Sequence, residues 1–340
     1  ALQEVDPGIA LSEEDAITLA RHLIARWGAW NVVWLLGGDS RFEEVERWKR
    51  IGRAVLDPRD HDDPMKRLAT LHPCACKWIA EDFGGESWLD FFGYQSSHGD
   101  DEDSLRWHTS GPHTKASSHK PPRPIINLEP NYEAISCSPD MPPRTPQQVR
   151  RAAYWSLLIS PTAGVSYGHH VIWPWNDQYG DIEGHAFCGK ADAWHTGLDA
   201  EGAENMKTLR DIFTSGPWAD LAPLPELLSH QPGGENLQLF VAAAQTSDHS
   251  WSLIYLPEGG EIELNKDHLP PQWQACQLDP ITGYRQKLSA KHPSFSLPTH
   301  QDYLIEIKAI DQSKRHIPTN WNLLSKIKHL FTSKINIAFG

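Results

Sequence analysis

The chain has 340 residues and a mass of 38.3 kDa, which is enough for two domains. Its net charge is −13, so we expect no nucleic-acid partner, because duplex binding needs clustered positive charge. No apolar run approaches the roughly 18 residues of a membrane-spanning helix, so we expect no membrane partner either. The 15 tryptophans outnumber the tyrosines and the phenylalanines. Flat indole faces suit sugar rings, although a large core would also use them.

Helices and strands alternate over the first half of the chain. A helix is predicted over 12–27, because Ser12 and Asp15 form a capping box and Gly28 can end the helix. The apolar run 31–39 predicts a strand buried on both faces, as in parallel sheets. The remaining predicted elements are a helix at 42–55, strands at 67–71, 88–94, 124–129 and 164–173, a long loop at 99–122, and a helix at 146–158 that Thr145 caps. This alternation predicts a parallel α/β architecture.

The pattern changes after about residue 233. Short apolar runs separated by turn signals follow, without a helical period, and this is typical of an antiparallel β-sandwich. Its strands are predicted at 237–244, 250–256, 261–264, 272–278, 294–297 and 303–307. Residues 311–340 form a basic tail, which we expect to be helical and to dock on the body of the protein.

Two carboxylates follow predicted strands. Asp39 closes the run 31–39, and Glu129 closes the strand 124–129. The carboxyl ends of parallel strands face the ligand in α/β folds, so these two acids can meet across one cleft. Glycoside hydrolysis requires such a pair, one acid to protonate the leaving oxygen and the other to attack the anomeric carbon or activate water. Alternatively, each acid only caps the helix that follows.

An ordered set of motifs resembles the apiosidase-like glycoside hydrolase family. The motifs are Trp34-Leu-Leu-Gly-Gly-Asp39, His72-Pro73, Gln95-Ser-Ser-His98, Ile126-Asn-Leu-Glu-Pro-Asn-Tyr-Glu133, Arg151-Ala-Ala-Tyr-Trp155 and Tyr167-Gly-His-His-Val-Ile-Trp173. The resemblance implies a (β/α)8 barrel of the TIM type, followed by a β-sandwich that is sometimes labelled a collagen-binding domain. It also implies that Asp39 is the acid/base after barrel strand four and that Glu129 is the nucleophile after strand seven. Glu133 is the alternative nucleophile.

This alignment places the start of the chain just before barrel strand four. The chain would then carry strands four to eight only, and a preceding segment or another chain would complete the barrel. The expected domains are an incomplete barrel at 1–232, the sandwich at 233–310 and the tail at 311–340. No signal peptide opens the chain, whereas the resemblance favours a periplasmic or secreted protein; a cytoplasmic location stays open.

The remaining candidate site residues are polar or aromatic and lie near predicted strand ends. We expect them to bind the substrate, with core packing as the alternative for each. They are Trp34, His72, Gln95, His98, Tyr132, Tyr167, His170 and Trp173. On a strand, His169 and His170 would point to opposite faces, and the resemblance favours His170 as the residue in the pocket.

Neither a metal nor another cofactor is expected. The sequence His72-Pro-Cys74-Ala-Cys76 spaces its cysteines more closely than zinc sites do. The five cysteines are irregularly spaced and do not form a disulfide framework. The leading hypothesis is a retaining glycoside hydrolase that acts on a side chain of a plant or microbial polysaccharide. The alternatives are a non-catalytic carbohydrate-binding or scaffold protein and a metal-dependent hydrolase.

Overall fold

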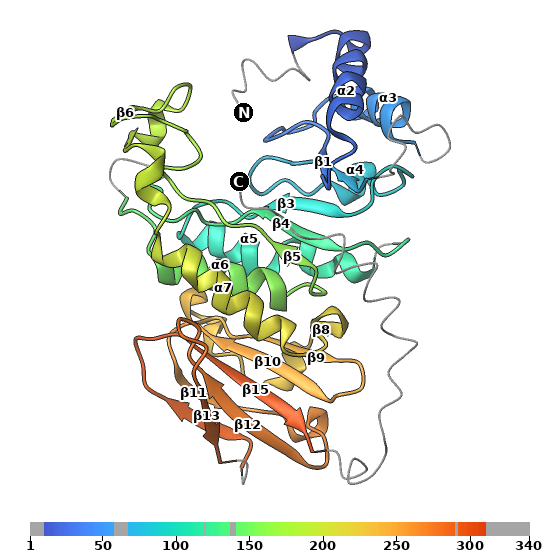
Figure 1. Ribbon diagram of the computed structural model, residues 1–340. Coiled ribbons are helices and arrows are strands. Elements are labelled where there is room, and N and C mark those ends of the chain that lie inside the picture. The colour runs from blue at the N-terminus through green and yellow to red at the C-terminus, as the bar shows by residue number, and fades with distance from the viewer. Residues whose placement is uncertain (1–9, 58–66, 119, 137–140, 290–291, 311–340) are drawn as a thin grey trace.

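The protein is described by a computed structural model that covers residues 10–57, 67–118, 120–136, 141–289 and 292–310. The tail predicted at 311–340 lies outside these residues. Figure 1 shows short parallel strands beneath a pair of N-terminal helices, a layer of helices below those strands, and an antiparallel sheet at the other end of the molecule. The structure therefore confirms a mixed α/β fold with a C-terminal antiparallel sheet.

Local capping signals set the ends of two predicted helices. Ser12 accepts the backbone N–H of Asp15 at the start of the first helix. Thr145 and Gln148 form a reciprocal capping box before the helix that begins at Pro146. The helices are α2 (Glu13–Trp27), α3 (Val45–Leu56), α4 (Ala80–Phe83), α5 (Glu102–Ser110), α6 (Pro146–Leu158) and α7 (Glu201–Thr214). The pattern did not predict α7.

Five short strands run parallel to one another. They are β1 (Trp34–Leu35), β2 (Ala69–Thr70), β3 (Phe92–Gln95), β4 (Ile125–Glu129) and β5 (Gly164–Val165). β1 pairs with β2, and β3, β4 and β5 pair in that order. The Thr70 hydroxyl joins the two sheets, because it donates to the carbonyl of Phe91 and accepts the N–H of Gly93. The carboxyl ends of all five strands therefore face the same edge.

Two of the predicted strands are much shorter than expected. The run 31–39 contains the two-residue β1, and the side chains of Val33 and Leu35 are about half exposed rather than buried. β1 has β2 as its one strand neighbour within the described residues, so alternate side chains face solvent. The predicted strand 164–173 ends at Val165 and continues as turns. The alternation argument for His169 and His170 is therefore wrong.

The predicted loop at 99–122 contains a helix. Asp101 accepts the N–H of Ser104 and caps α5, and the residues Pro112–Ser118 form a 3-10 helix, η1. Leu105 and His108 of α5 are buried. The loop prediction was wrong because the polar composition of this segment concealed a single apolar face, and a core can cover such a face.

The C-terminal sheet has six antiparallel strands in the order β13-β12-β15-β10-β9-β8. Their bounds are β8 (Leu221–Pro223), β9 (Ala242–Thr246), β10 (Trp251–Leu256), β12 (Trp273–Leu278), β13 (Arg285–Leu288) and β15 (Tyr303–Ala309). A separate antiparallel pair, β11 (Gly260–Glu263) and β14 (Ser294–Leu297), shares an apolar core with one face of this sheet, through side chains such as Ile254, Phe295 and Ile305. The edge strand β8 precedes the expected domain boundary at 233.

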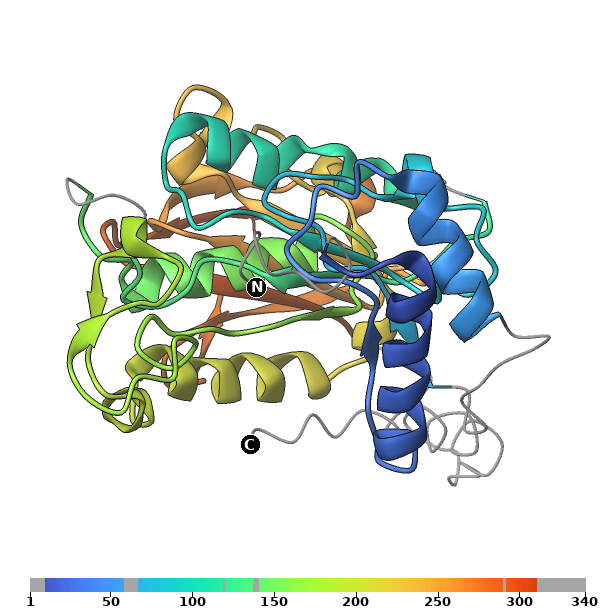
Figure 2. The same cartoon turned by 90° about the horizontal axis from the view of Figure 1, so that it is seen from above.

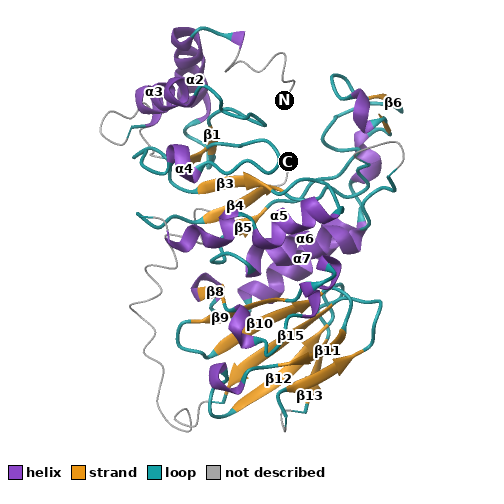
Figure 3. Ribbon diagram, turned by 180° about the vertical axis from the view of Figure 1, so that it is seen from behind, coloured by secondary structure: helices purple, strands orange, loops and turns teal. Residues whose placement is uncertain are grey.

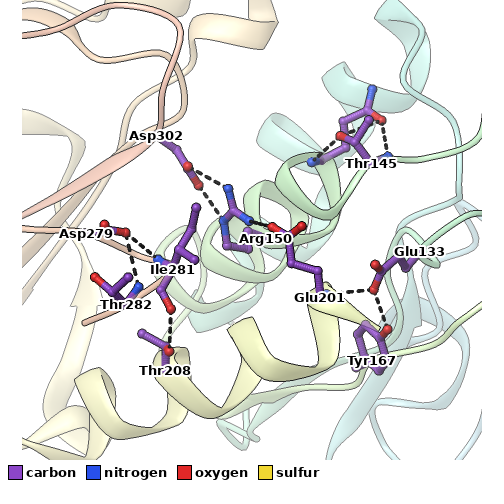
Figure 4. A network of polar contacts seen from close by, with 12 residues as sticks. Glu133, Thr145, Arg150, Tyr167, Glu201, Thr208, Asp279, Ile281, Thr282 and Asp302 are labelled. Carbon is purple, nitrogen blue, oxygen red and sulfur yellow. Dashed lines mark hydrogen bonds and ion pairs between the residues drawn. The ribbon is translucent and has the colours of Figure 1, made fainter. Parts of the chain in front are cut away.

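Helices α6 and α7 cover the other face of the C-terminal sheet. Figure 2 shows them side by side, and a continuous core that includes Trp155, Phe213 and Trp251 joins them to the sheet. A buried ion pair crosses this interface, with Arg150 of α6 bound to both carboxylate oxygens of Asp302 at 2.9 and 3.0 Å (Figure 4). The parallel strands and the antiparallel sheet are thus packed on opposite sides of one helical layer.

A long excursion, residues 168–200, separates β5 from α7. It contains the short antiparallel pair β6 (Gly180–Asp181) and β7 (Lys190–Ala191). Figures 1 and 3 show that this excursion rises on the same side of the parallel strands as α2 and α3, away from the C-terminal sheet. None of the described helices has the length and apolarity that crossing a bilayer requires.

Candidate active site

The turn after β1 fixes the position of Asp39. Gly37 has a φ of +75°, and a Cβ atom there would lie 2.7 Å from the Trp48 ring, so both the conformation and the space require glycine. Asp39 itself has a φ of +48°, which is uncommon for a residue with a side chain. Glu129 is the last residue of β4. Both predicted acids therefore lie at the carboxyl ends of parallel strands.

His72 connects the two acids. Its Nδ1 accepts the backbone N–H of Asp39 at 3.2 Å, and its Nε2 lies 3.2 Å from Oε2 of Glu129. Because Nδ1 is an acceptor, the proton of the neutral ring is on Nε2, which then donates to Glu129. His72, which was predicted as a site residue after a strand, therefore holds the backbone of Asp39 and the side chain of Glu129.

His98 binds the second oxygen of Glu129. Its Nε2 lies 2.9 Å from Oε1, and its Nδ1 lies 3.0 Å from the carbonyl oxygen of Pro130. The imidazole packs on the Tyr132 ring with 4.4 Å between the ring centroids. Each oxygen of the Glu129 carboxylate therefore has its own histidine, and this holds the carboxylate in one orientation.

The two acids have pKa values shifted in opposite directions. Burial alone would raise the pKa of Glu129, but the hydrogen bonds from His72 and His98 hold it at about 2. The pKa of Asp39 is raised, first by burial and then by the negative charge of Glu129. One carboxyl group is thus kept ionised and the other is biased toward its protonated form, which is how a pair of acids divides the roles of nucleophile and proton donor.

Tyr132 faces the same pair. The pKa of its phenol is raised by burial first, then by the charges of Glu129 and Asp39. The hydroxyl therefore stays protonated at physiological pH and can donate a hydrogen bond toward the carboxylates.

Asn127 supports Glu129 from within β4, and sequence reasoning did not select it. Its amide nitrogen donates to the hydroxyls of Ser96 and Ser156, and its carbonyl oxygen accepts the N–H of Glu129 at 3.3 Å. Asn127 is fully buried. A polar residue in an otherwise apolar strand was the available signal, because a buried amide needs partners.

Gln95 is buried at the end of β3, and its Cα is the register partner of Glu129. In the described part of the chain, its side-chain oxygen has no hydrogen-bond partner. Gln95 therefore lies beside Glu129, and its role in binding the substrate stays a prediction.

Glu133 is held in a different environment. Its Oε2 accepts the Tyr167 hydroxyl at 2.6 Å and the backbone N–H of Gly202 at 2.9 Å, in the first turn of α7 (Figure 4). A Cβ atom on Gly202 would lie 2.3 Å from that oxygen. Glu133 and Tyr167 thus form a buried anchor for α7, and no hydrogen bond among the described residues joins either of them to Asp39 or Glu129.

Three further predicted residues lie in packing environments. His170 is buried, with Nε2 3.0 Å from the carbonyl oxygen of Lys190. Trp173 packs on the small core of the excursion, and Trp34 packs on the N-terminal core. Among the described residues, no hydrogen bond joins His170 or Trp173 to either acid.

Cys74 and Cys76 join no metal-binding group of side chains in the part of the chain that the structure describes. Where the structure describes the chain, no three side chains of His, Cys, Asp and Glu are grouped to hold a metal ion. Burial raises the pKa of the Cys74 thiol, and burial followed by the neighbouring Cys74 raises that of Cys76 to about 11. Both thiols are therefore protonated near neutral pH.

The family match below makes this chain a glycoside hydrolase. One solved structure, described as a glycoside hydrolase family 5 protein from Bacteroides vulgatus, has a TM-score of 0.76 and 23% identity, over 91% of this chain and 68% of that chain. A second, described as a glycoside hydrolase, has a TM-score of 0.74 and 20% identity, over 90% and 71% of the two chains. These likenesses show a fold of the TIM-barrel type.

Residues 3–220 match the family model "Apiosidase-like, catalytic domain", and the chain belongs to that family. A comparison with curated proteins gave no match.

Proposed function

We propose that this glycoside hydrolase cleaves its substrate with retention of configuration, with Glu129 as nucleophile and Asp39 as acid/base. The observation that carries the proposal is the pair of histidines on Glu129, which keep that carboxylate ionised, while burial and the charge of Glu129 raise the pKa of Asp39. Glu129 attacks the anomeric carbon while Asp39 donates its proton to the leaving oxygen. Asp39 then takes a proton from the water that releases the sugar.

His72 and His98 have complementary tasks in this reaction. Both bind Glu129 through Nε2, so they keep it charged and hold it in place for attack. When the covalent bond forms, Glu129 loses its charge, and the raising effect of that charge on the pKa of Asp39 disappears. The pKa of Asp39 falls at that stage, in the direction that a general base requires.

We further propose that β1 to β5 correspond to strands four to eight of a (β/α)8 barrel. The order of five parallel strands supports this correspondence, as do the positions of Asp39 after β1 and Glu129 at the end of β4. The proposed substrate is a side chain of a plant or microbial polysaccharide, in keeping with the apiosidase-like family.

Release of reducing sugar from a panel of pectic and other plant glycans tests the activity. With a substrate in hand, Glu129→Gln should abolish turnover while the protein keeps its native circular dichroism spectrum, and the exposed-residue control Glu226→Gln should remain active. Azide should restore turnover to Glu129→Ala and yield a glycosyl azide of the opposite anomeric configuration. Full activity in Glu129→Gln would refute the assignment of the nucleophile, and bound glycan without any hydrolysis would favour a carbohydrate-binding protein instead.

A further inference from the structure

The excursion 168–200 exposes aromatic rings although it has a core of its own. Ile182, Cys188 and Ala191 are buried there. Trp175 is nevertheless 58% exposed and Tyr179 is 65% exposed. Single exposed aromatic residues are common, but several on one small excursion indicate a binding surface.

The exposed Trp175 and the partly buried Trp194 form a flat platform. The indoles of Trp175 and Trp194 are stacked with 4.7 Å between centroids and 4° between planes. The backbone N–H of Trp194 donates to the carbonyl of Asn176, and that of Trp175 donates to the carbonyl of Ile172. Trp175 also has a φ of +60°, a conformation that a tryptophan adopts rarely. The Trp194 indole covers one face of the Trp175 indole. Because Trp175 is 58% exposed, its other face is open to solvent.

The platform is tied to the loop that follows the proposed nucleophile. The N–H of Glu133 donates to the carbonyl of Gly168, and the N–H of His170 donates to the carbonyl of Glu133. Glu133 lies four residues after Glu129. The excursion also rises on the same side of the parallel strands as α2 and α3 (Figure 3). A polymer that occupies the active site can therefore continue along the excursion.

The charges around the platform limit what it can bind. The excursion carries five acidic residues and a single cation, Lys190, which already contacts Asp181 at 3.7 Å and the Tyr179 ring at 5.7 Å. An anionic polymer would be repelled at this surface, whereas the C–H face of a neutral sugar can stack on an indole while carboxylates at the rim accept its hydroxyls.

We propose that the Trp175–Trp194 platform binds a neutral sugar residue of the polysaccharide, at a subsite away from the bond that is cleaved. This inference rests on the proposed function, since it assigns a polymeric and locally uncharged substrate to the same enzyme. The platform adds affinity for the polymer and takes no part in bond cleavage.

Affinity electrophoresis of the full chain carrying Glu129→Gln tests the inference, in gels that contain arabinoxylan, xyloglucan or polygalacturonate. At least one neutral polymer should retard the protein, and polygalacturonate should retard it less. Trp175→Ala should lower the affinity about tenfold, which is the order expected for loss of one stacked aromatic contact. Trp175→Tyr keeps a flat ring and should keep most of the affinity. The matched control is Trp30→Ala, because Trp30 is 69% exposed and lies outside the excursion.

Binding and hydrolysis are read separately in this design. If neither neutral polymer retards the protein, or if Trp30→Ala weakens binding as much as Trp175→Ala, the platform is not a sugar subsite. The same conclusion follows if Trp175→Tyr loses as much affinity as Trp175→Ala. Retardation that depends on Trp175 supports the subsite whether or not the unsubstituted protein hydrolyses the polymer. Failure of the unsubstituted protein to hydrolyse it would count against the proposed function alone.

Discussion

The backbone amide of Asp39 and the carboxylate of Glu129 are bound to opposite nitrogens of one imidazole. His72 accepts the first through Nδ1 and contacts the second through Nε2, at 3.2 Å in each case. One ring therefore fixes the spacing between the two acids and sets the ionisation of Glu129. The relationship makes His72 a positioning residue whose removal should alter the pH dependence of catalysis as well as its rate.

Replacing His72 by alanine should move the acidic limb of the pH profile of kcat/KM to higher pH. The pKa of Glu129 is held at about 2 by two histidines, and losing one donor leaves burial less opposed, so the pKa rises. The loss of activity relative to the unsubstituted protein should be greater at pH 4 than at pH 7. The exposed His230 provides the control, since His230→Ala should leave the profile in place. An equal loss of activity at every pH would contradict this role.

Asp39→Asn should raise the stability of the folded protein near neutral pH while it abolishes turnover. Burial and the charge of Glu129 raise the pKa of Asp39 in the folded protein above its value in the unfolded chain. The folded state therefore loses stability as the pH rises from the unfolded-state pKa through the folded-state pKa. A neutral amide removes this penalty, for a gain of about 1 kcal/mol. Thermal unfolding at pH 5 and pH 8 measures this gain in stability, which should be larger at pH 8. Asp192→Asn, at an exposed position outside the helices, should change neither value.

Tyr167→Phe should affect stability more than catalysis. The Tyr167 hydroxyl donates to Glu133 at 2.6 Å, and Glu133 is buried, so the variant leaves a buried carboxylate with one donor fewer. The expected cost is about 1–3 kcal/mol in the free energy of unfolding. Denaturant titration measures this cost, and the exposed Tyr284→Phe should have no effect. A large change in KM with unaltered stability would instead assign Tyr167 to substrate binding.

Asp302→Asn should destabilise both ends of the molecule together. Arg150 and Asp302 are buried, and the Tyr255 hydroxyl also donates to Asp302. The variant leaves the buried guanidinium with the largely exposed Glu201, 3.8 Å away, as its remaining anionic partner. The expected loss is about 3–5 kcal/mol. Because the pair joins α6 to the C-terminal sheet, near- and far-ultraviolet circular dichroism should report one shared unfolding transition at a lower temperature. Glu204→Gln, which removes an exposed pair with Lys207, should cost less than about 1 kcal/mol.

Local signals were sufficient for several elements and for both acids. The Ser12 N-cap of α2 and the capping box of α6 depend on residues three positions apart, so the sequence shows them directly. The predicted capping box at α2 is present only as this N-cap bond. The apolar strand β4 ends at Glu129, and the rule that ligands lie at the carboxyl ends of parallel strands selected that residue together with Asp39. His72, Gln95 and His98 followed from the same rule.

Other features depend on contacts between distant parts of the chain. The length of β1 was overestimated because burial on two faces needs neighbours that an apolar run cannot reveal. α5 was missed because its polar composition concealed the buried face that a core covers. Asn127 was not selected because its partners, Ser96 and Ser156, come from other elements.

The sequence by itself determined which acids end the parallel strands, because strand alternation and helix caps are encoded within a few neighbouring residues. Only the tertiary structure decided how those acids differ. Glu129 is bound by histidines from two other strand ends, and the pKa values of Glu129 and Asp39 depend on the charges and burial around them. Glu133 is bound instead to Tyr167 and to α7. These surroundings arise from residues that are far apart in the chain and become neighbours on folding.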